Sequence, residues 1–130
     1  MKFSKYGNKK CIFNGFRFDS LKEMNRYVEL KLIQKSGAIR GLTLQPRFLL
    51  QPSFKWQGKT ERKIEYVADF SYWMGTSFYI EDVKSTFTKK NPVYRIKKKM
   101  LLHKINSEGV WVDGDNHLSN PNLIKFIEHD

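Results

Sequence analysis

Apolar and polar residues near the start of the chain predict a hairpin followed by a helix. Residues 12–18 have the pattern of a short hairpin, because Asn14-Gly15 supplies the positive-φ residues that a tight turn requires. Ser20 fits a helix N-cap, and Gly37 fits a helix end. Between them, apolar side chains recur on one helical face, namely at Met24, Tyr27, Val28 and Leu32. A helix is therefore expected over residues 20–36.

The spacing of apolar residues changes to that of strands between residues 41 and 85. Short extended pieces interrupted by Pro46 and Pro52 come first, and two longer strands joined by a tight turn follow. The expected strands are 42–44, 47–50, 54–56, 63–73 and 78–84, with turns at 57–60 and 74–77.

Helical spacing returns at Asn91-Pro92, an N-cap followed by a proline in the first turn. This second helix is expected to end near Asn106 and to bury Val93, Ile96 and Met100. Residues 110–112 and 123–127 are the last strand candidates, with a polar loop between them. The order of helix, three strands, helix and strand predicts an α/β sandwich, and 130 residues suit a single domain over residues 1–130.

The charge of the chain narrows the class of partner. The net charge is +11 and the acids are concentrated near the C-terminus, so most of the chain is strongly basic. Such a field favours a polyanion, above all nucleic acid, because neutralising phosphates releases condensed counterions. Solubility or an acidic membrane surface are the alternatives. Residues 1–10 are expected to form a mobile basic arm.

Composition also bears on the compartment. The basic N-terminus lacks the apolar run of a signal peptide, and no stretch approaches the ~18–20 apolar residues that span a bilayer. The only cysteine, Cys11, allows no internal disulfide. A cytoplasmic protein without a membrane partner is therefore expected.

Two acids and a lysine are the strongest candidates for chemistry. Asp69 lies among apolar residues, where a carboxylate must be paired, protonated or bound to a metal. In an unbroken strand over residues 63–73 it would lie on the face opposite to Tyr66. Asp82 and Lys84 are two residues apart in a strand and share one face, whereas Glu81 belongs to the other. A hairpin around Gly75 would bring the two aspartates together. They could hold Mg²⁺, with Mn²⁺ as a substitute, while the ammonium orients water or stabilises negative charge. A salt bridge on a solvated face is the alternative.

Glu23 has two interpretations. The segment Ser20-Leu21-Lys22-Glu23 fits a capping box, in which the glutamate reaches back to a backbone amide. A glutamate in the first turn of a helix packed on the sheet could also reach a metal. Gln45 is a lesser candidate, because an amide before Pro46 could lie near bound water or DNA, although a turn-forming Gln-Pro explains it equally well.

Four segments carry a family resemblance: residues 18–23, 44–48, 66–70 and 81–85. In this order they resemble a family of small phage and prophage proteins assigned to the PD-(D/E)xK, or restriction-endonuclease-like, superfamily. The likeness extends over about residues 5–104. It implies an αβββαβ core with a mixed sheet flanked by helices. It also implies that Asp69, Asp82 and Lys84 are the catalytic positions, with Asp69, Asp82 and Glu23 as metal ligands. Ala68 stands where the motif has proline, and Glu81 is an alternative second acid.

A run of bases follows the acids and would hold the DNA backbone; it consists of Lys89, Lys90, Arg95, Lys97, Lys98 and Lys99. A solvated helix face is the alternative. The expected function is a Mg²⁺-dependent DNA endonuclease acting on branched or recombining phage DNA, like a Holliday-junction resolvase, and possible as a homodimer. A non-catalytic DNA-binding phage regulatory protein with the same fold is the rival hypothesis. An RNA-binding module is a weaker one, since no RNP-type aromatic motif is present.

Overall fold

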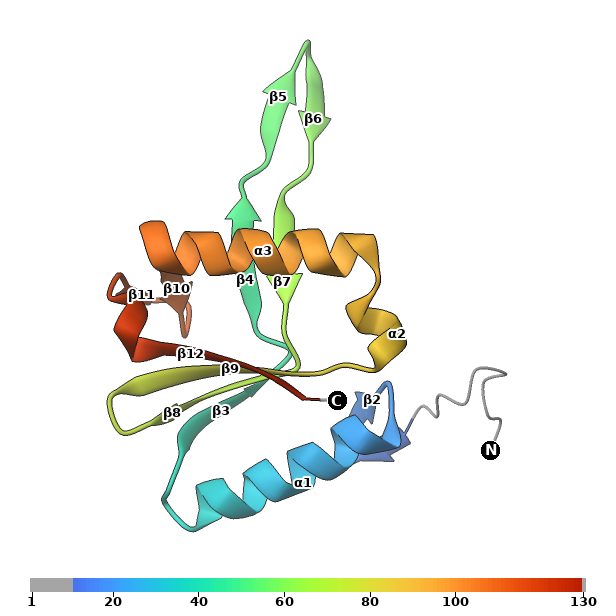
Figure 1. Ribbon diagram of the computed structural model, residues 1–130, viewed down its shortest axis with the longest axis vertical. Helices are drawn as coiled ribbons and strands as arrows, with labels where there is room; N and C mark the ends of the chain where they lie inside the picture. The colour runs from blue at the N-terminus through green and yellow to red at the C-terminus, as the bar shows by residue number, and fades with distance from the viewer. Residues whose placement is uncertain (1–10, 130) are drawn as a thin grey trace.

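The computed structural model describes residues 11–129 and has two long helices on opposite sides of a mixed β-sheet (Figure 1). The sheet has the order β12-β9-β8-β3, in which β12 is parallel to β9 and the other neighbours are antiparallel. Its strands are β3 (Arg40–Leu44), β8 (Phe70–Met74), β9 (Ser77–Val83) and β12 (Ile124–His129). The predicted α/β class is therefore confirmed. The arm predicted at residues 1–10 lies outside the described residues.

The N-terminal hairpin and first helix form as the sequence predicts. Strands β1 (Cys11–Phe13) and β2 (Phe16–Phe18) join at Asn14-Gly15, where both residues have positive φ. Helix α1 (Leu21–Lys35) begins after Ser20, whose hydroxyl accepts a hydrogen bond from the Glu23 amide. The predicted buried face is wrong in one position, because Leu30 is buried while Leu32 is exposed. The buried face runs through Tyr27 and Leu30, toward the sheet.

The strand predicted at residues 63–73 is in fact two strands. Strand β7 (Ile64–Val67) pairs with β4 (Arg47–Gln51), whereas β8 pairs with β3 and β9. The chain changes partners at Ala68-Asp69. There the Ala68 amide bonds to the Pro46 carbonyl, and the Asp69 amide bonds to the Glu81 carbonyl. Because of this break, side chains before and after it lie in different cores. Tyr66 and Ala68 belong to one core cluster, and Phe70 and Tyr72 belong to the other.

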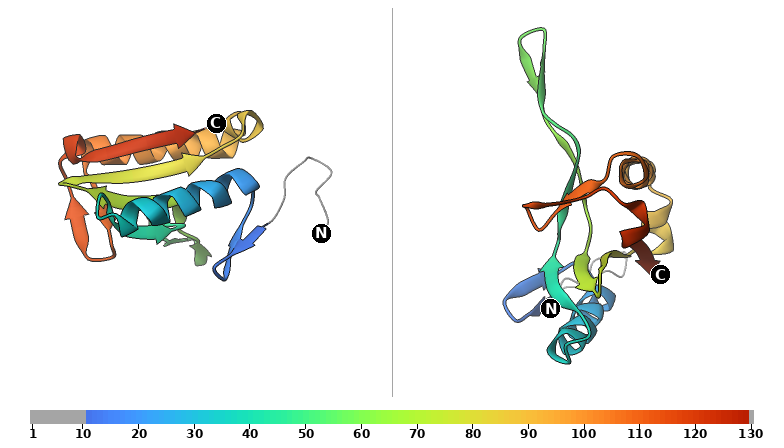
Figure 2. Two further views of the ribbon diagram at one scale, coloured as in Figure 1. Left: turned by 90° about the horizontal axis from the view of Figure 1, so that it is seen from below. Right: turned by 90° about the vertical axis from the view of Figure 1, so that its left-hand side faces the viewer.

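Strands β4 and β7 continue into a second pair, β5 (Phe54–Trp56) and β6 (Lys59–Glu61), and together they form a long ribbon. Its lower part crosses α3 (Pro92–Ser107), and its upper part projects far beyond the rest of the molecule (Figures 1 and 2). The turn at its tip uses Gln57 and Gly58, both with positive φ. We refer to residues 53–63 as the ribbon tip.

The C-terminal third corrects three sequence predictions. Residues 86–89, between the predicted strand and helix, form a short helix that was not predicted, α2 (Thr86–Lys89), capped by the Ser85 hydroxyl. Helix α3 buries Leu101 and Ile105 and leaves Val93 and Ile96 exposed, so its predicted face is wrong. The polar loop contains a second strand; β10 (Val110–Val112) pairs with β11 (Asn116–Leu118), and a 3-10 turn η1 (Pro121–Leu123) leads into β12.

Two hydrophobic cores fill the spaces on either side of the sheet. The α1 side contains Phe18, Tyr27 and Phe70, and the α3 side contains Phe48, Phe78 and Leu101. Strand β9 serves both, because successive side chains of a strand point to opposite faces. Within residues 11–129, none of the helices is long and apolar enough to cross a membrane. The start of β8 and the end of β9 therefore lie between two packed layers.

Candidate active site

The break between β7 and β8 places Asp69 against Asp82 at the end of β9. The Asp69 amide donates a hydrogen bond of 2.9 Å to Asp82 Oδ1. In return, the Val83 amide donates a hydrogen bond of 2.7 Å to Asp69 Oδ2. Each aspartate is thus held by the backbone of the other's strand. Because backbone atoms set both orientations, the two carboxylates are fixed before any ligand binds.

Lys84 lies between the two carboxylates. Its Nζ is 3.7 Å from Asp69 Oδ2 and 3.8 Å from Asp82 Oδ1. The same ammonium lies 5.7 Å from the centre of the Tyr94 ring, within cation–π range. Its backbone amide bonds to the His129 carbonyl, so the parallel partner strand β12 anchors the lysine. The sequence-predicted group of Asp69, Asp82 and Lys84 is therefore brought together.

A tyrosine that sequence analysis assigned to the opposite face also contacts the acids. The Tyr66 hydroxyl donates a hydrogen bond to Asp82 Oδ2. Beyond it, the Tyr94 ring lies 6.3 Å from the Tyr66 ring, and the Tyr94 hydroxyl donates to Glu128. Strand alternation predicted the wrong side for Tyr66 because it assumed an unbroken strand. Glu128 reaches this region because it stands opposite Asp82 in the parallel β12–β9 register, which no local signal reveals.

Glu23 completes the acidic group from α1. Its side chain is buried, and its amide bonds to the Ser20 hydroxyl, as in the predicted capping arrangement. Burial, with the negative charges of Asp69 and Asp19, raises the pKa of Glu23 from 4.5 to about 7, although the charge of Lys84 opposes the shift. The Asp19 backbone amide also bonds to this carboxylate and opposes the shift. Glu23 therefore serves the helix end and faces the aspartates at once.

Both aspartates share this excess of negative charge. Burial raises the pKa of Asp69 to about 6, against the lowering effects of Lys84 and the Val83 amide. Burial likewise raises the pKa of Asp82, against the effects of Lys84 and Tyr66. A raised carboxyl pKa means that the folded protein resists the ionised form. Three acids thus face a single ammonium in a region poor in water.

Glu81 has a different environment from Asp82. It is fully buried on the α1 side of the sheet, where it accepts hydrogen bonds from Arg26, Tyr72 and His129. Burial by itself would raise the pKa of Glu81, but the hydrogen bonds from Arg26 and Tyr72 outweigh it and hold the pKa below its usual range. Glu81 is thus fully paired and points away from Lys84, as strand alternation predicted.

Gln45 takes part mainly through its backbone. It has φ of 50° and its amide donates a hydrogen bond of 2.9 Å to the Asp69 carbonyl. Its exposed side chain lines a cleft of about 370 Å³ together with Glu23 and Arg17. Arg17 was not singled out in the sequence, yet it gives this cleft a cation beside the acids. The turn at Gln45-Pro46 therefore borders the acidic group.

The predicted basic residues fall into two sets. Lys89 and Lys98 form ion pairs with Glu128, at 3.7 Å and 3.1 Å, and these three line a cleft of about 250 Å³. Burial would raise the pKa of Glu128, but the Tyr94 hydroxyl and Lys98 lower it. The other predicted bases form no ion pair within the described part of the chain; these are Lys90, at the end of α2, and Arg95, Lys97 and Lys99 of α3.

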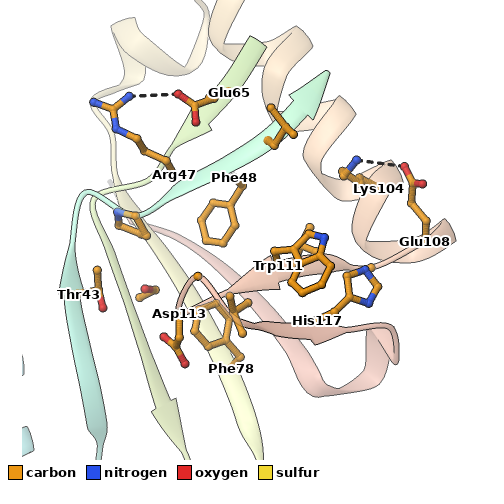
Figure 3. A pocket seen from close by; sticks show the side chains of 17 residues that line it. Thr43, Arg47, Phe48, Glu65, Phe78, Lys104, Glu108, Trp111, Asp113 and His117 are labelled. Carbon is orange, nitrogen blue, oxygen red and sulfur yellow. Dashed lines mark hydrogen bonds and ion pairs between the residues drawn. The ribbon is translucent and has the colours of Figure 1, made fainter. Parts of the chain in front are cut away.

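A larger cleft lies away from the acids. It measures about 600 Å³ and is bordered by the lower part of the ribbon, the β10–β11 hairpin and the end of α3 (Figure 3). Arg47 pairs with Glu65 on one wall, and Lys104 pairs with Glu108 on another. None of the predicted acids lines it, and Asp113 on its wall accepts a hydrogen bond from the Trp73 indole. This cleft and the acidic group therefore lie in different places, and the candidate active site is at the acids.

Metal ligation was tested by the grouping of possible ligands. Among residues 11–129, no three His, Cys, Asp or Glu side chains are grouped closely enough to hold an ion together. Instead, Asp69 and Asp82 are bridged by Lys84, and Glu23 stands within electrostatic range of Asp69. The residues predicted as ligands thus lie in one region, arranged around an ammonium.

Comparison with known proteins gives a family without a function. Neither a curated protein nor a solved structure matches the chain. One family model, described as a protein of unknown function (DUF1064), matches residues 3–118. That range includes Glu23, Asp69, Asp82 and Lys84, and it ends before β12. The chain therefore belongs to the DUF1064 family of proteins of unknown function.

Proposed function

We propose that this protein is a metal-dependent DNA endonuclease with a restriction-endonuclease-like core. One arrangement carries the proposal: two buried aspartates from adjacent strands face each other, and a lysine ammonium lies within 4 Å of both. The order α1, β3, β8, β9, α3, β12 and the mixed sheet agree with the αβββαβ order of that superfamily. A salt bridge alone does not explain three acids around one base.

The donor atoms suit a hard divalent cation such as Mg²⁺. Carboxylate oxygens are the ligands that Mg²⁺ prefers. Burial raises the pKa values of Glu23 and Asp69 although the charge of Lys84 opposes the shift, so a bound cation would stabilise their ionised forms. Asp69 and Asp82 would hold the ion, with Glu23 completing the set. When bound, the ion would polarise a phosphate oxygen and lower the pKa of a bound water. Mn²⁺ is expected to substitute.

The remaining side chains would position the reacting groups. Lys84 would move from the two aspartates toward the phosphate, where its ammonium stabilises developing negative charge. Tyr66 would keep Asp82 oriented through its hydroxyl hydrogen bond. Gln45 would fix the Asp69 backbone through its amide. Tyr66 and Gln45 thus hold the two aspartates in the orientation that the fold already gives them, which favours a preorganised site.

The charge of the chain supports DNA as the substrate. The net charge of +11 favours phosphates, and the bases of α3 that form no ion pair among residues 11–129 would neutralise them; such contacts position the duplex without reading its sequence. Branched or recombining phage DNA is the substrate we favour. Cutting two strands with one site per chain would require two copies, so a homodimer on DNA is part of the proposal.

Cleavage assays with neutral isosteres test the proposal. Supercoiled plasmid, linear duplex and four-way-junction DNA are incubated with Mg²⁺, Mn²⁺ or EDTA. The variants Asp69→Asn and Asp82→Asn are expected to lose cleavage by at least a hundredfold while retaining DNA binding in EDTA. Asp115→Asn is the matched control, because Asp115 lies in the exposed β10–β11 turn. Undiminished cleavage in both site variants contradicts the assignment. Tight, salt-sensitive binding with no cleavage by the wild type supports the non-catalytic DNA-binding alternative.

A further inference from the structure

The ribbon tip has no role in the acidic site, yet it is the most prominent feature of the molecular outline. It projects from the body as two strands that no other layer covers (Figures 1 and 2). Every residue from Ser53 to Lys63 is exposed. An isolated two-stranded hairpin is only marginally stable in water. A projecting hairpin without a core of its own is typical of a segment that packs on a partner.

Two aromatic side chains lie on one face of the ribbon tip. Phe54 stands opposite Glu61, and Trp56 stands opposite Lys59, so these four residues share a face. Phe54 is 46% exposed and Trp56 is 62% exposed. Lone exposed aromatics are common on protein surfaces. Two of them side by side on an arm that buries neither indicate a surface that is completed by binding.

The charge of the ribbon tip identifies the kind of partner. It contains four bases and one acid: Lys55, Lys59, Arg62, Lys63 and Glu61. Only Lys63 is paired beyond the tip, with Glu65 at 3.5 Å. Cations interleaved with exposed aromatics match a nucleic acid, since the cations neutralise phosphates and the rings stack on bases or pack against sugars. An apolar protein partner would not require this excess of bases.

The lower end of the ribbon adjoins the acidic site. At its lower end, the Gln45 amide bonds to the Asp69 carbonyl, and the Ala68 amide bonds to the Pro46 carbonyl. Gly58 at the tip is eleven residues from Asp69, which corresponds to roughly 35 Å along extended chain. One helical turn of B-DNA is about 34 Å long. The extended length therefore allows the tip to lie up to about one turn of duplex away from the aspartates.

We propose that the ribbon tip is a second DNA-binding element, which enters a groove of the duplex about one helical turn from the phosphate that is cut. The major groove is about 12 Å wide and admits a two-stranded β-ribbon. Lys55, Lys59 and Arg62 would contact phosphates, and Phe54 and Trp56 would pack against the groove wall. The identity of the ligand as DNA rests on the proposed function, whereas the use of the ribbon for binding has its own test.

Affinity for DNA of two lengths tests this inference in EDTA, where no cleavage occurs. At about 3.4 Å per base pair, duplexes of about 10 and about 30 base pairs that are centred on the acids extend about 17 Å and about 51 Å to each side, so only the longer one is expected to reach the tip. Trp56→Ala is expected to weaken binding to the long duplex about tenfold, as the loss of one stacked ring does. Binding to the short duplex is expected to change less than twofold. Lys55→Gln with Lys59→Gln should lower the slope of log affinity against log salt by about 2 on the long duplex.

The chain offers a matched control in Trp111, which is 60% exposed and lies on β10. Trp111→Ala should leave both affinities unchanged, and all variants should keep the wild-type melting temperature because these side chains lie outside both cores. Equal long-duplex affinity for wild type and Trp56→Ala overturns the inference. So does a variant whose only change, seen by sedimentation, is the loss of a dimer. If the wild type binds DNA without cutting it, the nuclease proposal fails while the ribbon inference stands; if it binds no DNA, both fail.

Discussion

Replacing Glu23 by glutamine should make the protein more stable while removing its activity. The pKa of Glu23 is raised from 4.5 to about 7 in the folded chain. Each pH unit of difference corresponds to about 1.4 kcal/mol. Keeping this buried carboxylate ionised therefore costs about 3 kcal/mol of folding free energy. Glutamine has nearly the same shape and can still accept the Asp19 amide hydrogen bond, so Glu23→Gln removes the cost and keeps the packing.

The pH dependence fixes the sign of this effect. A carboxyl group with a raised folded-state pKa binds its proton more tightly in the folded chain. Its contribution to stability is complete below about pH 4.5 and is lost as the pH rises to about 7. The variant and the wild type should thus have equal stability near pH 4. The difference should grow between pH 4.5 and 7 and stay constant above, at up to about 3 kcal/mol.

Chemical denaturation at several pH values measures this difference, and thermal melting at pH 8 should show a shift on the order of 10 °C. Glu29→Gln is the matched control, since Glu29 is exposed on the same helix and pairs with Arg26 at 3.3 Å. It should change stability by about 0.5 kcal/mol or less at every pH. The reasoning is refuted if Glu23→Gln is no more stable than the wild type at pH 8, or if its gain does not shrink toward pH 4.5.

Three further predictions concern neighbouring groups. Glu81→Gln should destabilise the protein by about 2–3 kcal/mol at pH 7, because it weakens a buried ion pair. Asp82→Asn should instead raise the melting temperature, since burial disfavours the charge that it removes. Equal effects of the two substitutions on denaturation curves would contradict the different roles of these acids. Tyr66→Phe should raise the pKa of Asp82 further and shift the acidic limb of the cleavage–pH profile upward, at a stability cost of about 1 kcal/mol; an unmoved limb would exclude a positioning role. Replacing a base that forms no ion pair among the described residues by glutamine should lower the slope of log affinity for DNA against log salt by about 1, more than Lys98→Gln, because Glu128 already neutralises Lys98; the bases to compare are Lys90 at the end of α2 and Arg95, Lys97 and Lys99 of α3.

The same stability measurements can also report the binding of magnesium. A cation bound by Glu23, Asp69 and Asp82 would stabilise the ionised carboxylates, which burial and, to a smaller extent, mutual repulsion disfavour. Its binding is therefore coupled to proton release and to stability. The proposed function thus connects the excess of acid in this region to a ligand, and it explains why a fold would keep three carboxylates at a place where each one costs stability.

Local signals in the sequence determined those elements whose cause is local. The turn at Asn14-Gly15, the cap at Ser20 and the start of α3 at Asn91-Pro92 all form as predicted. Strand alternation also separated Asp82 from Glu81 correctly, because the two-residue period of a strand is a property of its own backbone. The α/β class follows from the same information, since the spacing of apolar residues identifies each element and its order.

Tertiary contacts decided the features that depend on which elements meet. Val93 and Ile96 of α3 looked like its core face, but Leu101 and Ile105 fill the space beside Phe48 and Phe78, and so they are buried. The strand through Asp69 is broken because its two halves pair with different strands, and the break turns Tyr66 toward Asp82. No spacing within one segment can contain that information.

The acidic group shows the same division. Sequence motifs selected Asp69, Asp82 and Lys84, and local helix capping accounted for Glu23. The hydrogen bonds between Arg26 and Glu81 could be seen only in the three-dimensional structure. The same holds for the ion pairs of Glu128 with Lys89 and Lys98, which depend on the parallel register of β12. Residue type and local period are written in the chain itself. Burial and charge pairing arise between segments that are far apart in the chain. The fold therefore decided the pKa values of the acids and which of the nearby lysines form ion pairs with Glu128.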